Sequence, residues 1–143
     1  MSLEDIKKRF LNEIRLRGED DQYIDRNEER EILQIAIQLG ISREAAHSAL
    51  ATVCAEQGYV LESAVIKSMR ERVELAVSDD GQLDQKEFEM IFASAQRAMQ
   101  GKTSDRNIKL LLIQVIEETG KTRVKTGWFS DWFGRMKKEL GLV

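Results

Sequence analysis

Apolar side chains recur every three to four residues along most of the chain, which is the spacing of one face of an α-helix. The chain contains no proline, and glycines stand where the apolar patterns stop. We therefore expect an all-α protein, a compact bundle of six to seven helices. The expected helices cover residues 3–17, 26–39, 42–58, 61–77, 85–100 and 105–119, with a short one in the C-terminal tail.

A nine-residue acidic turn occurs twice, and both copies read Asp-Asp-x-x-(Ile/Leu)-Asp-x-x-Glu before an apolar helix. The bundle therefore contains an internal repeat of acidic turn plus helix. The last Asp and the Glu of each copy have the spacing of a capping box, in which each side chain accepts a backbone N–H of the other residue. This interpretation needs no ligand. The two pairs are Asp25 with Glu28 and Asp84 with Glu87.

The same turns also have features of a calcium-binding loop. In the second copy Gly81 falls at the sharp turn, and Glu87 falls at the last ligand position. The first ligand position holds Ala76, and in the first copy it holds Arg17, with Gln22 in place of the glycine. A hard cation needs six or more oxygen ligands, which neither copy supplies alone. Two interpretations follow: capping alone, or capping together with a weak cation site shared by both turns.

Both copies resemble the half-repeats of the tellurite-resistance TerB-like superfamily, over residues 15–100. The motifs are Asp21-x-x-Ile24-Asp25-x-x-Glu28, followed by Ile32-x-x-Ile35-Ala36, and Gly81-x-Leu83-Asp84-x-x-Glu87, followed by an apolar helix. The resemblance implies an all-α fold and a role in bacterial stress response, where related domains accompany J-domain co-chaperones. It also implies an acidic cluster around a divalent cation, Ca²⁺ or Mg²⁺. The implied metal ligands are Asp21, Asp25, Glu28, Asp80, Asp84 and Glu87.

The composition is that of a soluble globular protein, with 33% charged and 42% hydrophobic residues. The net charge of −3 is unevenly spread. Residues 102–143 hold nine Lys and Arg against five Asp and Glu, a surplus of four positive charges; residues 1–101 hold 13 against 20, a surplus of seven negative charges. The sequence has no concentrated cluster of basic residues, so it does not indicate nucleic-acid binding. The sequence lacks a membrane-spanning apolar run and a signal-peptide core, so we expect a cytoplasmic protein.

A single histidine, His47, and a single cysteine, Cys54, restrict the chemistry. They lie two helical turns apart, too far to share a zinc ion, so we expect a surface or partly packed histidine and a buried cysteine. One cysteine excludes an intramolecular disulfide and favours a reducing compartment. Neither a Ser-His-Asp arrangement nor a phosphate-binding glycine loop is recognisable. We therefore expect no enzymatic activity.

The tail, residues 128–143, combines four aromatic residues with several basic ones. We expect residues 1–127 to form the main TerB-like domain and the tail to form an amphipathic helix that begins after Ser130. One interpretation docks this helix on the core, which its aromatic side chains would close. The other leaves it free to contact a partner groove or a membrane surface. The candidate partner-binding residues are Trp128, Phe129, Trp132, Phe133, Arg135, Lys137 and Lys138.

These observations favour a non-catalytic binding or regulatory module, connected with stress response, that uses an acidic surface and a protein partner. The alternative is an adaptor whose aromatic, basic C-terminal helix binds a partner or a membrane surface.

Overall fold

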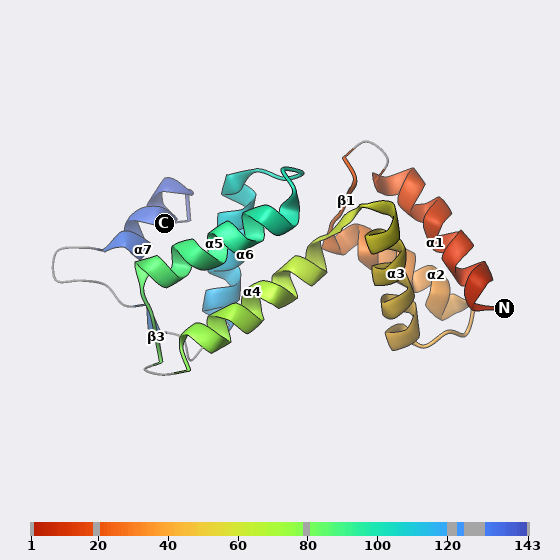
Figure 1. The fold of residues 1–143 in the computed structure, drawn as a ribbon, viewed down its shortest axis with the longest axis horizontal. Helices are drawn as coiled ribbons and strands as arrows, with labels where there is room; N and C mark the ends of the chain where they lie inside the picture. Colours follow the sequence, from red (N-terminus) through yellow and green to blue (C-terminus); the bar gives the residue numbers. More distant parts are fainter. Residues whose placement is uncertain (1, 19–20, 79–80, 120–122, 125–130, 143) are drawn as a thin grey trace. The chain divides into compact units, whose positions relative to one another are not determined.

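The computed structural model describes residues 2–18, 21–78, 81–119, 123–124 and 131–142. Within these ranges the chain forms seven helices and four two-residue strands, which confirms the all-α class (Figure 1). The elements are α1 (Leu3–Gly18), β1 (Tyr23–Ile24), α2 (Arg26–Gln38), α3 (Arg43–Gln57), β2 (Val60–Leu61), α4 (Glu62–Ala76), β3 (Gln82–Leu83), α5 (Gln85–Met99), α6 (Asp105–Glu118), β4 (Arg123–Val124) and α7 (Trp132–Glu139).

The helices group into two compact units, Met1–Ala64 and Val65–Val143. The first unit holds α1, α2 and α3 with β1 and β2, and the second holds most of α4 with α5, α6, α7 and the other two strands. The division falls inside α4. The boundary expected after residue 127 lies outside the described residues.

Each unit has the same order of elements, a helix, a strand, two helices and a second strand. In the first unit β1 pairs in parallel with β2, so that Tyr23 lies opposite Val60. In the second unit β3 pairs in parallel with β4, so that Gln82 lies opposite Arg123. Parallel neighbours need a long crossover connection, which the two intervening helices provide in both units. The repeat seen in the sequence as an acidic turn plus a helix is therefore part of a larger structural repeat.

The two acidic turns share a left-handed residue at the corresponding place, although the residue type differs. Gly81 has a φ of 71°, and Gln22, at the corresponding place, has a φ of 54°. Glycine adopts this left-handed conformation without steric cost, whereas a side chain opposes it. The missing glycine in the first copy therefore raises the steric cost of this conformation, which Gln22 nevertheless adopts.

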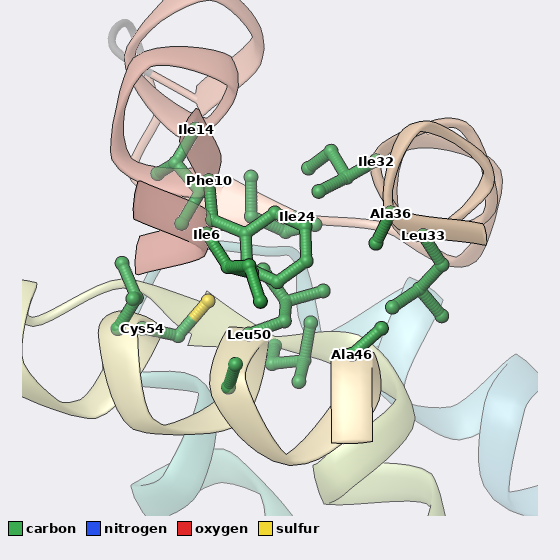
Figure 2. Packing of buried hydrophobic residues seen from close by; sticks show 13 residues of the cluster. Ile6, Phe10, Ile14, Ile24, Ile32, Leu33, Ala36, Ala46, Leu50 and Cys54 are labelled. Carbon is green, nitrogen blue, oxygen red and sulfur yellow. The ribbon is translucent and has the colours of Figure 1, made fainter. Parts of the chain in front are cut away.

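The core of the first unit lies between α1, α2 and α3. Figure 2 shows the side chains of Phe10 and Ile24 among those of the surrounding helices. Full burial of a side chain such as Phe10 stabilises the fold by about 1.5–3 kcal/mol. Two buried alanines, Ala46 and Ala49, have small side chains, so neighbouring helices can approach the inner face of α3 closely. The remaining buried members are Ile6, Ile14, Ile32, Leu33, Ala36, Leu50, Val53, Cys54 and Leu61.

The core of the second unit is centred on α6, whose Leu111, Leu112 and Ile113 are all buried. The tail also contributes, because α7 buries Trp132 and Leu140. The N-cap of α7 is Asp131 and not the expected Ser130, which lies outside the described residues. The Asp131 carboxylate accepts the Gly134 N–H at 3.0 Å, three residues further along the chain.

Candidate functional site

Both predicted capping boxes are present. Asp25 Oδ1 accepts the Glu28 N–H at 2.8 Å, and Glu28 Oε1 accepts the Asp25 N–H at 3.0 Å. Asp84 Oδ1 accepts the Glu87 N–H at 2.7 Å, and Glu87 Oε1 accepts the Asp84 N–H at 3.1 Å. These four carboxylates therefore satisfy backbone donors at the first turns of α2 and α5.

The fifth described acid, Asp21, also serves its own turn, because its Oδ1 accepts the Tyr23 N–H at 3.1 Å. Burial raises the pKa of the Glu28 carboxyl; the hydrogen bond from the Asp25 N–H lowers it, and the charges of Asp25 and Asp21 raise it again. Asp80 lies outside the described residues. Over the described part of the chain, no three His, Cys, Asp or Glu side chains are arranged to hold a metal ion. The shared cation site stays a prediction.

The described part of the tail is packed. Trp132 is 4% exposed, and its ring centroid lies 5.4 Å from that of Phe88 on α5 and 5.5 Å from that of Phe133. Polar contacts also tie α7 to α6, because Lys137 Nζ lies 2.6 Å from Glu117 Oε1. Arg106 donates to the Leu140 carbonyl at 2.7 Å. Of the other predicted partner-binding residues, Arg135 and Lys138 are exposed, and Trp128 and Phe129 lie outside the described residues.

The two units differ most at the fourth residue of the helix that follows the acidic turn. In α5 this residue is Phe88, which packs against Trp132 of the helix that follows the second strand. In α2 it is Glu29, which is only 7% exposed and meets Ser63 of the corresponding helix, α4. The same place is therefore filled by two aromatic rings in the second unit and by a buried carboxylate in the first.

The carboxylate of Glu29 accepts one hydrogen bond and lies close to a histidine nitrogen. Its Oε1 accepts from Ser63 Oγ at 2.9 Å and lies 3.1 Å from His47 Nε2. The His47 side chain is 48% exposed, in agreement with the expected surface or partly packed histidine. The three side chains line an open hollow of about 480 Å³. Leu33, Arg43 and Glu44 complete its lining.

A second buried carboxylate, Glu62, follows β2 directly in the same unit. Its Oε2 accepts the Tyr23 hydroxyl, and its Oε1 lies 3.3 Å from Arg26 Nε. Burial, followed by the hydrogen bond and charge of Glu62, raises the pKa of the Tyr23 phenol far above its ordinary value. A polar hollow of about 460 Å³ adjoins this group and is also lined by Asp25 and Arg30. The first unit thus buries two glutamates, at one end of α2 and the start of α4.

The groups around Glu29 are not arranged as a Ser-His-acid triad. In such a triad the hydroxyl donates to the imidazole, and the acid holds the other ring nitrogen. Here the Ser63 hydroxyl donates to the same carboxylate oxygen that His47 Nε2 approaches. The carboxylate is therefore the centre of the cluster.

This cluster was not predicted from the sequence, although the chain contains a signal for it. Glu29 shares the spacing of Ile32, Leu33 and Ala36, so the apolar stripe of α2 begins with a carboxylate. A charge on a buried stripe is costly unless it is paired and hydrogen-bonded. The hydrogen-bond donor to Glu29 could not be predicted in the same way, because Ser63 lies more than thirty residues away along the chain.

No family model, no curated protein and no solved structure matches the chain. None of the described helices is long and apolar enough to cross a lipid bilayer.

Proposed function

We propose that the protein is a non-catalytic binding module whose first unit takes a Lys or Arg side chain of a partner protein into the hollow around Glu29. The observation that carries the proposal is the difference between the two repeats. The second unit closes this place with Phe88 and Trp132, whereas the first keeps a hollow with a buried carboxylate. A buried charge lowers stability unless well paired, so its presence here favours a binding role.

The chemistry of the hollow suits a cationic group on an aliphatic stem. Glu29 and Glu44 offer carboxylates, Leu33 offers an apolar wall, and the Ser63 hydroxyl holds Glu29 in place. Arg43 is the one cation among the lining residues. Residues 1–64 carry eight Lys and Arg against thirteen Asp and Glu, and this surplus of five negative charges favours encounters with basic partners.

The resemblance to the TerB-like superfamily supports a regulatory role in stress response for such a module. In this proposal the acidic turns mainly stabilise the fold of the unit, and Glu29 and its neighbours recognise the partner. Weak binding of a divalent cation at the turns remains a separate proposal, which the variants at Asp84 discussed below address.

The test is an amide NMR titration of the ¹⁵N-labelled protein with N-acetyl-lysine methylamide and N-acetyl-arginine methylamide. We expect saturable shifts at the amides of His47 and Ser63, and none with N-acetyl-glutamate methylamide. Glu29→Gln keeps the shape and an oxygen for Ser63 but removes the charge, so it should abolish the shifts. Glu56→Gln, on the exposed face of α3, is the matched control and should leave them unchanged.

Two results would overturn this function. One is the absence of saturable shifts with either cationic probe at about a hundred millimolar, a concentration that half-saturates a site with a binding free energy of only about 1.4 kcal/mol. The other is an equal response of the wild-type protein and Glu29→Gln. Circular dichroism of both variants establishes that they are folded.

A further inference from the structure

Helices α4 and α5 form an open groove within the second unit. It has a volume of about 380 Å³, and its floor includes Ile91, which is buried. Two large apolar side chains line it at the surface, Leu75 on α4 and Met90 on α5, which are 75% and 64% exposed. Two such residues beside one groove form a local apolar patch, which is typical of an interaction surface.

The charged residues that line the groove give it a surplus of positive charge. Arg72 on α4 and Arg97 on α5 both line it, and within the described residues neither makes an ion pair. The one carboxylate in the lining, Glu87, already accepts the Asp84 N–H through Oε1. Two guanidinium groups against one engaged carboxylate make an apolar groove with a positive surplus.

The walls of the groove also select the form of the occupant. Both walls are α-helices, so their backbone donors and acceptors are used inside the helices and offer no ladder to an extended peptide. Affinity must come from side chains, and a helical occupant satisfies its own backbone. An amphipathic helix presents apolar side chains three and four residues apart, which matches a groove between two helices.

We propose that this groove docks an acidic amphipathic helix of a partner protein. The apolar face of that helix packs on Leu75 and Met90, and its flanking Asp or Glu side chains pair with Arg72 and Arg97. Arginine favours such contacts because its planar group binds a carboxylate through two hydrogen bonds. This surface lies in the second unit, so the proposal is independent of the hollow around Glu29.

The test uses a fluorescein-labelled synthetic helix with leucines on one face and glutamates on both flanks. A second peptide carries lysine at every glutamate position. Fluorescence anisotropy with the full chain should show binding of the acidic peptide, weaker at higher salt, and about tenfold weaker or no binding of the basic one. Arg72→Glu and Arg97→Glu should each weaken binding of the acidic peptide about tenfold, and Met90→Ser should weaken it several-fold.

The matched controls are Lys67→Glu on α4 and Lys86→Glu on α5. Both remove an exposed cation from the same helices outside the groove lining, and both should leave the affinity within about twofold. Equal binding of the two peptides, or equal losses in the groove and control variants, would overturn the proposal. A dimer in sedimentation that Met90→Glu abolishes, without peptide binding, would assign the groove to a second copy and would also overturn it. Thermal melting of every variant separates lost binding from lost folding.

Discussion

Replacement of Asp84 separates the capping role of the acidic turn from a cation-binding role. Its Oδ1 accepts the Glu87 N–H at 2.7 Å, and its own N–H donates to Glu87 at 3.1 Å. Asp84→Ala removes the acceptor and the negative charge at the start of α5. Asp84→Asn removes only the charge, because an amide oxygen caps a helix nearly as well as a carboxylate.

The structure sets the size of the expected effects. Loss of an N-cap side chain costs about 0.5–2 kcal/mol, and loss of a favourable charge near the helix N-terminus costs about 0.3–1 kcal/mol. We therefore expect Asp84→Ala to lower the free energy of unfolding by about 1–2 kcal/mol and Asp84→Asn by less than about 1 kcal/mol. Asp25→Ala, which breaks the matching box in the first unit, should resemble Asp84→Ala.

The assay is urea unfolding followed by circular dichroism, in a chelator and in about 5 mM calcium. A folded-state site with a dissociation constant a hundredfold below the calcium concentration would add about 2.7 kcal/mol of stability. If the carboxylates act only as caps, the loss in each variant is the same in both conditions. A loss that grows with calcium, in the Asn variant as in the Ala variant, would refute the interpretation of capping alone and support a cation site in addition to the caps.

Two further predictions concern buried side chains. Trp132→Ala should lower the free energy of unfolding by about 3–5 kcal/mol because it removes the ring that packs on Phe88, whereas Phe133→Ala, at a half-buried position, should cost about 1 kcal/mol; equal losses in urea unfolding would argue against the docked tail. Burial raises the pKa of the Cys54 thiol to about 11, so a disulfide reagent at pH 8 should label it about a hundredfold more slowly in the native protein than in denaturant. Between about pH 8.5 and 11 the unfolded chain releases this proton and the folded chain keeps it, so the free energy of unfolding should fall as pH rises, and Cys54→Ala should lessen the fall.

The parts of the fold that the sequence predicted depend on neighbouring residues. Helix ranges follow from apolar spacing, and the caps at Ser42, Ser104 and both acidic turns follow from residues three positions apart. The division into two units does not follow in this way. It depends on the parallel pairing of β1 with β2 and of β3 with β4, which joins segments that have no shared motif. Two-residue strands are also too short to show the alternation of apolar and polar residues that predicts a β-strand.

The candidate site was only partly predicted, because here too the prediction depended on residues that are neighbours in the sequence. The acidic motifs were recognised, and their described residues proved to hold the turns and helix starts together. The buried carboxylate of Glu29 was overlooked because its neighbours, His47 and Ser63, come from two other helices. The contrast between the repeats marks its importance, since Phe88 and Trp132 occupy the same place in the second unit.

The parallel strand pair also couples the closing of a long loop to the packing of the core. Val60 donates its N–H to the Gln22 carbonyl at 2.9 Å, across a loop that contains both α2 and α3. Closing a loop of about 40 residues costs on the order of 3 kcal/mol, and a bridge of two residues returns about 1 kcal/mol for each hydrogen bond. Burial of Ile24 and Leu61, the strand residues that belong to the core, supplies the rest. Hydrogen exchange at the Val60 amide therefore reports the opening of this core.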